Sequence, residues 1–218
     1  MTDRSTTMIV RPGTHRRHAR KFTLGQVTCI DPLPIVSEVP SLCSTNTRAL
    51  DLGAGTGRNA IYLARHGVHV DAIDRFAPAI DEINDYARVN KLPIRALVHD
   101  LCQCDPEFHG YELILCTLIL HLLSPSRAAS LLENARIQAA PGTLHVVAAI
   151  TSEGDFSSEF LPGERFYPHP DDLRRAYAHA GWQIQRAYTE KRTMRQRHAD
   201  GSATHNLVSF LIARRTSL

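Results

Sequence analysis

The chain of 218 residues is 43% hydrophobic and 22% charged, a composition typical of a globular protein with one sizeable core. Its formal net charge of +3 makes it mildly basic. The first residues are polar and hold no apolar run of the length that a signal peptide or a membrane helix needs, so we expect a cytoplasmic protein and no membrane segment.

The first 46 residues are rich in Pro, Ser, Thr and Arg and show no sustained hydrophobic periodicity before a short apolar stretch at residues 33–42. We interpret residues 1–46 as a basic arm or lid and residues 47–218 as one cofactor-binding domain. The basic residues of this arm can attract an anionic partner; they are Arg4, Arg11, Arg16, Arg17, Arg20 and Lys21. Because aromatic residues that stack on bases are not interleaved with them, a solvated arm is the simpler interpretation, and we expect no nucleic-acid partner.

From residue 48 onward, short apolar runs alternate with helical patterns, which is typical of a parallel sheet with helices on both faces. The run at residues 112–120 is almost continuously apolar, as in a central strand that is buried on both faces. Gly67 ends the first helix, because glycine readily adopts the left-handed conformation of a helix C-cap. The predicted strands span residues 48–52, 68–73, 94–98, 112–120 and 143–150, and the predicted helices span residues 58–66, 78–90 and 126–139.

The pattern changes after residue 150. A loop over residues 151–170 leads into a short predicted helix at 171–180, and two further strands follow at 182–189 and 206–213. The polar segment between these two strands contains Asp-Gly and no helical pattern, so the strands form a hairpin. The fold class is therefore α/β, a doubly wound and mostly parallel sheet that ends in an antiparallel hairpin. A dinucleotide-binding fold would repeat strand and helix in its second half instead.

The sequence Asp-Leu-Gly-Ala-Gly-Thr-Gly at residues 51–57 joins the first strand to the first helix and predicts a nucleotide-type cofactor site. Gly53, Gly55 and Gly57 allow a tight turn and a close approach of the backbone to a ligand, towards which the helix amides also point. A turn that binds pyrophosphate commonly reads Gly-x-Gly-x-x-Gly, whereas the third glycine comes one residue earlier in this chain. Asp51 adds negative charge beside the turn, which would repel a pyrophosphate but suits the ammonium and sulfonium groups of S-adenosylmethionine.

Two further acids lie at the ends of the next predicted strands, in the same crevice at the carboxyl edge of the sheet. Asp74 ends the second strand, where a carboxylate can accept hydrogen bonds from both ribose hydroxyls; its alternative role is to cap the following helix. Asp100 ends the third strand, where it can accept the adenine amino proton, while Leu101 offers a backbone amide and an apolar wall. Arg75 can lie against the adenine edge or be a surface arginine. Three acids at three successive strand ends favour S-adenosylmethionine as the ligand.

These residues resemble the class I S-adenosylmethionine-dependent methyltransferases. Residues 51–57 are similar to the first motif of that family, Asp74 to its ribose acid and Asp100 to its adenine-contacting position. The resemblance extends from about residue 48 to residue 215. It implies S-adenosyl-L-methionine as the cofactor and a seven-stranded sheet whose last strand is antiparallel.

Within this class, three segments resemble the tellurite-resistance methyltransferase branch, namely residues 57–59, 166–177 and 205–215. That branch implies methylation of small, soft nucleophiles. We include Asn59, which lies in the first of these segments, and Thr117, which lies in the fourth predicted strand, among the cofactor-binding candidates.

Methyl transfer from a sulfonium is an in-line displacement with a good leaving group, so the enzyme mainly has to hold the nucleophile near the methyl carbon and exclude water. A soft sulfur, selenium or tellurium nucleophile needs little help, whereas a protonated amine or hydroxyl needs a base, for which histidine is suited. His121 follows the central strand and is the preferred base; His205, which begins the last strand, is a second candidate. Tyr167 belongs to an aromatic loop that can close the pocket. His198 and Arg195, in the hairpin connection, can also reach a substrate.

The same cofactor allows two other outcomes. In the first, the amino group of the cofactor attacks a carbon of the cofactor's own side chain, and the products are azetidine-2-carboxylate and methylthioadenosine. A pocket closed by the arm would favour this reaction. In the second, the domain binds the cofactor without catalysis. Nucleic-acid methylation is disfavoured, because residues 116–119 read Cys-Thr-Leu-Ile in place of the Asn/Asp-Pro-Pro-aromatic motif usual in such enzymes.

The five cysteines are odd in number and irregularly spaced, which argues against a disulfide framework and for reduced thiols. Cys102 and Cys104 form a Cys-x-Cys pair without a second pair at zinc spacing, so we expect no structural metal. We expect a small-molecule substrate, and the oligomeric state stays open.

Overall fold

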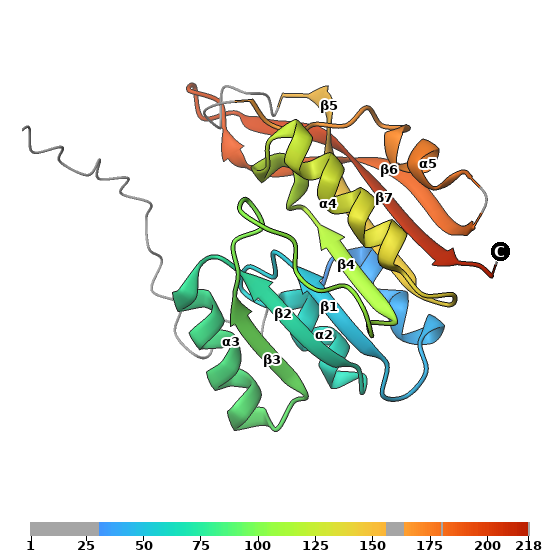
Figure 1. Ribbon diagram of the computed structural model, residues 1–218. Helices are drawn as coiled ribbons and strands as arrows, with labels where there is room; N and C mark the ends of the chain where they lie inside the picture. The colour runs from blue at the N-terminus through green and yellow to red at the C-terminus, as the bar shows by residue number, and fades with distance from the viewer. Residues whose placement is uncertain (1–30, 156–163, 180, 218) are drawn as a thin grey trace, which may run out of the picture.

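The computed structural model describes residues 31–155, 164–179 and 181–217. These residues form a seven-stranded sheet with the strand order β3-β2-β1-β4-β5-β7-β6 (Figure 1). The strands are β1 (Arg48–Leu52), β2 (His69–Asp74), β3 (Ile94–Val98), β4 (Leu113–Thr117), β5 (Leu144–Gly154), β6 (Trp182–Arg197) and β7 (Ala203–Arg215). Each of the seven strands that the sequence predicts is present, although several ends differ.

The strand directions divide the sheet into two parts. Strands β1 to β5 pair in parallel with one another, whereas β7 runs antiparallel to both β5 and β6. Parallel neighbours require crossover connections, which place helices on the faces of the sheet. The predicted α/β class, with a mostly parallel sheet and an antiparallel hairpin at the end, is confirmed.

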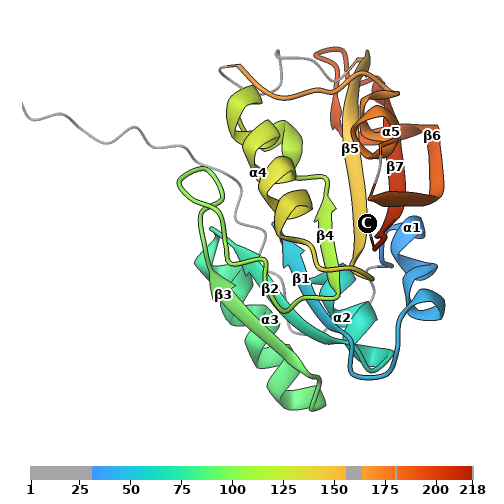
Figure 2. The ribbon, with the colours of Figure 1, turned by 45° about the vertical axis from the view of Figure 1, so that its right-hand side comes forward.

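Helices cover both faces of the sheet (Figure 2), and each layer encloses its own hydrophobic core. Because strand side chains alternate between the faces, neighbouring residues such as Val146 and Val147 belong to different cores. Among the described residues, none of the helices is long and apolar enough to cross a lipid bilayer. The first layer contains α1 (Pro34–Ser37), the 3-10 helix η2 (Val39–Leu42), α2 (Arg58–Arg65) and α3 (Ala77–Asn90), and the second contains α4 (Pro125–Gln138) and α5 (Asp172–Tyr177).

The apolar stretch at residues 33–42 packs into the first core, although its position in the chain predicted an arm or lid. Ile35, Val36 and Val39 have no exposed surface. Helix α1 begins at Pro34, a position where the missing N–H of proline is tolerated. Residues 1–30 lie outside the described residues, so the arm itself stays a prediction.

Strand β4 ends at Thr117, before the predicted end of the strand. Leu118 has a φ angle of 55° and turns the chain into the 3-10 helix η3 (Leu120–Leu122). Ile119 then packs against the glycine turn so closely that a Cβ on Gly53 would come within 2.7 Å of Ile119 Cδ1. A continuous apolar run indicates burial but not chain direction, so the hydrophobic pattern does not reveal this turn.

The carboxyl-terminal hairpin is confirmed and is longer than predicted. Strands β6 and β7 continue towards a turn at Asp200 and Gly201, where Gly201 has a φ angle of 83°. Ser202 N donates a hydrogen bond to Asp200 Oδ1 at 2.8 Å and closes the turn. The added strand residues are mainly polar, so their hydrophobic pattern is weak although the backbone pairing continues. Helix α5, in contrast, ends at Tyr177 and is shorter than predicted.

Candidate functional site

The glycine turn between β1 and α2 leaves the backbone open on one side. Gly53, Gly55 and Gly57 have φ angles of 70°, 58° and 82°, in the region that favours glycine. A Cβ on Gly57 would come within 2.7 Å of Ile83 Cγ1, so this glycine permits close packing of α2 on α3. A Cβ on Gly55, in contrast, would meet no atom of the described residues within 4 Å. Gly55 therefore faces open space, where a ligand can reach the backbone.

Asp74, at the end of β2, lies against this turn. Its Oδ2 accepts a hydrogen bond from Gly55 N at 3.0 Å. Its Oδ1 accepts a second from Phe76 N at 2.9 Å, just before α3. The carboxylate is half-buried, so one side of it remains accessible. The acid that we expect to bind ribose is therefore adjacent to the turn that we expect to bind the rest of the cofactor.

Asp51 lies on β1 with only 1% of its surface exposed. Among the described residues, its Oδ2 has no hydrogen-bond partner. Burial raises the pKa of Asp51 to about 7; the charge of Asp74 raises it as well, while Arg58 and a backbone hydrogen bond from Ala60 lower it. A buried carboxylate oxygen without a partner is costly unless a cation or a donor completes it. Asp51 therefore fits a site that binds a positively charged group.

Asp100 follows β3 and lies in a tight turn. Its Oδ1 accepts a hydrogen bond from Cys102 N at 2.9 Å, and this bond is the main reason why the pKa of Asp100 is lowered. The charge of the exposed Arg75 lowers this pKa as well. Leu101 is buried in the second core, and its carbonyl oxygen accepts a hydrogen bond from Arg127 Nε at 2.6 Å. Asp100 and Arg75 are thus close enough to interact, whereas the side chain of Leu101 packs in the core.

Asn59 and Thr117 form a buried hydrogen bond between α2 and β4. Asn59 Nδ2 donates to Thr117 Oγ1 at 3.0 Å. Asn59 Oδ1 accepts from Leu33 N, also at 3.0 Å. Both predicted cofactor residues are therefore already bonded to protein groups, and they position the wall of the site.

A cavity of about 490 Å³ lies between the glycine turn and the hairpin, within the size range of small-molecule sites. The predicted site residues that line it are Gly53, Gly55, Asn59, Thr117 and His121. The other predicted residues of the cofactor site, together with Tyr167, are not part of this lining; they are Asp51, Gly57, Asp74, Arg75, Asp100 and Leu101. The predicted site is therefore elongated. Asp74 and Asp100 lie at one end, after β2 and β3, and the cavity lies beyond the glycine turn.

His121 lines the cavity from η3, and its ring stacks on the ring of Tyr167 with the centroids 6.4 Å apart. Burial, reinforced by the positive charge of Arg165, lowers the pKa of His121 to about 4. Arg165 Nη1 donates a hydrogen bond to Leu122 O at 2.7 Å, which holds this loop against η3. The structure thus brings two predicted catalytic residues together. A neutral imidazole with so low a pKa is a weak proton acceptor.

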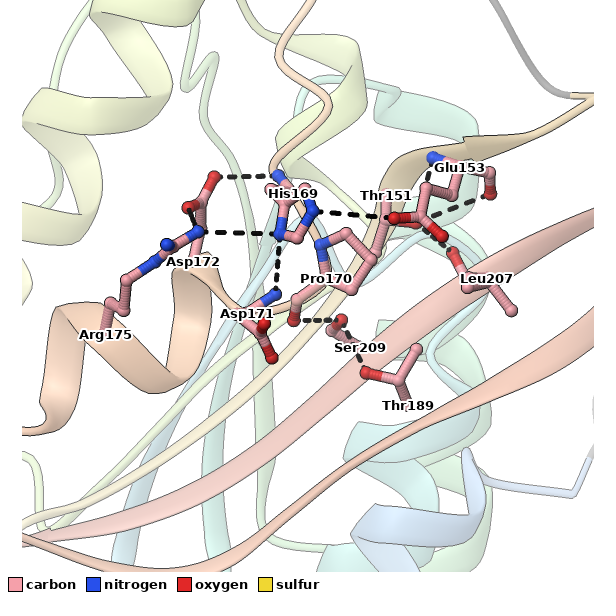
Figure 3. A network of polar contacts seen from close by, with 10 residues as sticks. All are labelled: Thr151, Glu153, His169, Pro170, Asp171, Asp172, Arg175, Thr189, Leu207 and Ser209. Carbon is pink, nitrogen blue, oxygen red and sulfur yellow. Dashed lines mark hydrogen bonds and ion pairs between the residues drawn. The ribbon is translucent and has the colours of Figure 1, made fainter.

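A polar network anchors the segment that follows Tyr167 (Figure 3). His169 Nε2 lies 3.5 Å from a carboxylate oxygen of Glu153 on β5. Ser209 Oγ on β7 donates a hydrogen bond to Pro170 O at 2.8 Å. These contacts from two strands hold the loop at the edge of the sheet and so position Tyr167.

The structure does not bring His205 into the cavity. Val208 of β7 lines the cavity, and because strand side chains alternate, His205 belongs to the opposite face of the sheet. Its backbone N donates a hydrogen bond to Asp155 Oδ2 at 2.9 Å. His198 lies in the same place, with Nε2 3.5 Å from that oxygen. The side chain of Arg195 lies outside the described part of the chain.

The far wall of the cavity consists of residues that no sequence motif marks. These side chains, from the segment before α1 and from strands β5 to β7, are Leu33, Ile150, Arg192, Met194, Val208 and Phe210. The guanidinium carbon of Arg192 lies 5.6 Å from the centroid of the Phe210 ring. Alternation in the last predicted strand would have indicated that Val208 and Phe210 share a face. No comparable pattern distinguishes Arg192 among the charged residues of β6.

The strand order, the single antiparallel strand and the glycine turn beside the acid at the end of β2 define a class of protein: they are the fold and motif of the class I S-adenosylmethionine-dependent methyltransferases. The model of one family of this class, "Tellurite resistance protein TehB", matches residues 32–206. The chain belongs to this TehB family. The matched range includes the segment at 33–42 that packs into the core.

Three similar proteins illustrate the relationship. Hemagglutinin 1 of Eikenella corrodens is 26% identical over 137 residues, which are 63% of this chain and 44% of that protein. The probable S-adenosyl-L-methionine-dependent methyltransferase TehB of Haemophilus influenzae is 27% identical over 108 residues, 50% of this chain and 37% of that protein. The crystal structure of TehB from Haemophilus influenzae has a TM-score of 0.71 at 21% identity and covers 83% of this chain and 61% of that chain. The chain thus matches less than half the length of these two curated relatives, and the solved structure shares its fold.

Proposed function

We propose that this protein is an S-adenosylmethionine-dependent methyltransferase that acts on a small-molecule nucleophile by in-line displacement. The observation that carries the proposal is the hydrogen bond from Gly55 N to Asp74 Oδ2 at 3.0 Å. It joins the acid suited to ribose to the glycine turn, at the carboxyl edge of the sheet where such folds bind ligands. Membership of the TehB family supports the same cofactor, because the Haemophilus influenzae relative is named for it.

The residues present fit this cofactor. S-adenosylmethionine supplies an electrophilic methyl group on a sulfonium centre. The open side of Gly55 admits a ligand to the backbone. The buried Asp51 Oδ2, which has no hydrogen-bond partner among the described residues, supplies negative charge behind the glycine turn that favours a cationic ligand. Asp74 is suited to the ribose hydroxyls and Asp100 to the adenine amino group. Orientation of the two reactants is the main contribution required of the protein, since the leaving group is already good.

We place the acceptor in the cavity beside the glycine turn. Its apolar wall, which includes Ile150, Val208 and Phe210, limits the access of water to the reacting centre from that side. The volume of about 490 Å³ also has to hold the reactive end of the cofactor, which supports a small acceptor.

The lowered pKa of His121 indicates which kind of nucleophile the site can use. Because burial lowers its pKa to about 4, the ring takes up a proton poorly near neutral pH. An amine or a hydroxyl that must lose a proton therefore gains little from this residue. The site favours a soft nucleophile, such as a thiolate or a selenium compound, that reacts without a strong base.

A product screen tests this proposal. The full chain is incubated with S-adenosylmethionine and a panel of thiols, selenium and tellurium compounds, amines and hydroxyl compounds, and products are identified by mass spectrometry. We expect a methylated soft nucleophile together with S-adenosylhomocysteine, and loss of turnover in Asp74→Ala. Asp85→Ala is the matched control, because Asp85 is an exposed acid on α3 that pairs with Arg88 at 3.2 Å. Turnover in the Asp74→Ala variant at the wild-type rate would contradict the proposal.

The same incubation separates the other outcomes that the sequence allows. Cyclisation of the cofactor would release methylthioadenosine in the absence of any acceptor. A module that only binds the cofactor would give neither methylthioadenosine nor a methylated product. Neither alternative gains support from the named relatives.

A further inference from the structure

Arg192 places a charge in the far wall of the cavity, among side chains that are mainly apolar. It lies on β6, at the edge of the sheet opposite to β3 and therefore away from the predicted adenine end of the site (Figure 1). Its guanidinium carbon lies 5.6 Å from the centroid of the Phe210 ring, which also lines the cavity. The far wall therefore offers a cation and an apolar surface side by side.

The guanidinium of Arg192 keeps hydrogen-bonding capacity for a ligand. Its Nε forms an ion pair with the carboxylate of Glu190, a residue that is not part of the cavity lining. This nitrogen is buried and has no hydrogen-bond partner among the described residues, so a further acceptor beside the guanidinium is favourable. A guanidinium has five N–H donors in a planar fork that matches a carboxylate. Pairing with Glu190 through Nε therefore leaves Nη donors that can bind a second carboxylate.

Positive charge predominates around the cavity. Among the described residues that line it, two are arginines and none is Asp or Glu. Arg58 begins α2 beside the glycine turn, and its charge lowers the pKa of the buried Asp51, so it belongs to the cofactor side. His121 is neutral near pH 7, because burial lowers its pKa to about 4. Arg192 is therefore the cation that faces an acceptor from the far wall.

We propose that the acceptor is a soft nucleophile, such as a thiol, that also carries a carboxylate, and that Arg192 is the specificity-determining residue that binds this carboxylate. The inference rests on the proposed function, because the nucleophile has to lie near the glycine turn to reach the methyl carbon. The thiol gives its proton to solvent, and its sulfur forms a bond to the methyl carbon while the bond from that carbon to the sulfonium breaks. S-adenosylhomocysteine is the leaving group.

The positions of the two walls determine the shape of this acceptor. The nucleophile lies at the glycine turn and the carboxylate at Arg192, so the two groups are at opposite ends of the molecule. The apolar side chains of the wall, which include Ile150 and Val208, suit a short apolar body between them. An inorganic oxyanion has no such body, and an uncharged thiol does not use the guanidinium. A thiol acid of a few carbon atoms uses both features of the wall.

Two thiols of equal length test this inference on the full chain. The acid 3-mercaptopropionate carries the carboxylate, and 3-mercaptopropionamide has a neutral amide in its place. The acid-to-amide ratio of kcat/KM is compared between enzymes, so the difference in intrinsic reactivity between the two thiols cancels. We expect Arg192→Gln to lower this ratio by about tenfold or more, mainly through a higher KM for the acid. Arg192→Lys keeps the charge and should recover part of the loss.

Arg186→Gln is the matched control on the same strand. Arg186 pairs with Glu38 at 3.7 Å, and its guanidinium carbon lies 5.6 Å from the centroid of the Tyr188 ring, but it is not part of the cavity lining. The acid-to-amide ratio of Arg186→Gln should equal that of the wild type. Circular dichroism verifies that each variant is folded. Equal ratios in the wild type and in a folded Arg192→Gln would overturn the inference.

Binding without turnover gives a second measurement. The methylated acid, 3-(methylthio)propionate, is titrated into the protein saturated with S-adenosylhomocysteine, and we expect Arg192→Gln to weaken its binding by about tenfold or more. Selenite separates this inference from the proposed function. If the wild type methylates selenite but neither thiol, the inference is wrong and the methyltransferase activity stands. If the wild type methylates no acceptor at all, the proposed function fails first, and this inference fails with it.

Discussion

The side-chain amide of Asn59 donates a hydrogen bond to Thr117 Oγ1 at 3.0 Å, between the start of α2 and the end of β4. The oxygen of the same amide accepts a hydrogen bond from Leu33 N, ahead of α1. Asn59 and Thr117 are only 5% and 7% exposed. One buried side chain therefore joins three segments around the cavity, and its removal would leave polar groups without partners.

Thr117→Val tests this contact, because valine keeps the shape of threonine but removes the hydroxyl acceptor. We expect the free energy of unfolding to fall by about 1–3 kcal/mol, since Asn59 Nδ2 is then buried without a partner. Urea unfolding followed by circular dichroism measures the change. Thr117→Ser keeps the hydroxyl, so its free energy of unfolding should fall by less than that of Thr117→Val. Equal unfolding free energies for wild type and Thr117→Val would show that the hydrogen bond does not contribute to stability.

Substitution of Gly53 should mainly lower stability, whereas substitution of Gly55 should mainly weaken cofactor binding. Both have positive φ angles, so alanine at either position costs about 1–3 kcal/mol of backbone strain. A Cβ at Gly53 would also overlap with Ile119 at 2.7 Å, whereas a Cβ at Gly55 would point into open space. We therefore expect Gly53→Ala to have the lower Tm, and Gly55→Ala to lose affinity for S-adenosylhomocysteine with a smaller loss of stability. Thermal unfolding and titration of both variants measure this, and wild-type affinity in Gly55→Ala would contradict it.

Asp51 should make cofactor binding depend on pH. Burial raises its pKa to about 7, so below pH 7 the carboxyl group is mostly protonated and must lose its proton to pair with a cation. We expect affinity to rise between about pH 6 and pH 8, by up to about tenfold per pH unit on the acid side of the pKa. Calorimetry in buffers of different ionisation enthalpy counts the protons released. A flat pH profile in the wild type, or an unchanged profile in Asp51→Asn, would exclude this role.

His145 leads to a prediction about acid stability. Its Nδ1 lies 2.8 Å from Tyr177 Oη, and burial lowers the pKa of His145 to about 3. In the unfolded chain the ordinary pKa of about 6.5 applies, so between about pH 6.5 and pH 3 the unfolded chain binds a proton that the folded chain does not. Stability should therefore decrease as the pH falls through this range, by up to about 1.4 kcal/mol per pH unit.

Urea unfolding at about pH 7.5, 6 and 5 measures this decrease. His145→Gln should make the free energy of unfolding less dependent on pH than it is in the wild type. Burial also lowers the pKa of His121, so part of the pH dependence should remain in His145→Gln. An identical pH dependence in wild type and His145→Gln would contradict the assignment of the acid-induced loss of stability to His145.

The cofactor end of the site was predictable because its chemistry is local in the sequence. The turn at residues 51–57 follows an apolar strand directly, and Asp74 and Asp100 each come at the end of another strand. In a parallel sheet the carboxyl ends of neighbouring strands lie at one edge, so strand boundaries alone place these acids near one another. The fold was predictable for the same reason, since hydrophobic periodicity marks strands and helices before any long-range contact is known.

The acceptor end was not predictable, because it depends on pairing between distant strands. Whether His205 faces the cavity follows from the register of β7, and its partner Asp155 comes directly after β5. The turn at Leu118, which places His121, interrupts a continuous apolar run that has no sequence signal for a bend. Arg192 reaches the cavity only because β6 extends further than its hydrophobic pattern indicates.

Titration of the wild type and of Asp74→Ala with S-adenosylhomocysteine tests the central claim most directly. We predict saturable binding to the wild type and a loss of at least about tenfold in affinity in Asp74→Ala, since each hydrogen bond to a charged group contributes about 1.5–3 kcal/mol. Asp85→Ala should bind like the wild type, and circular dichroism verifies that each variant is folded. Equal affinities of the wild type and a folded Asp74→Ala would contradict the assignment of Asp74 to the ribose and the account of the cofactor site built on it.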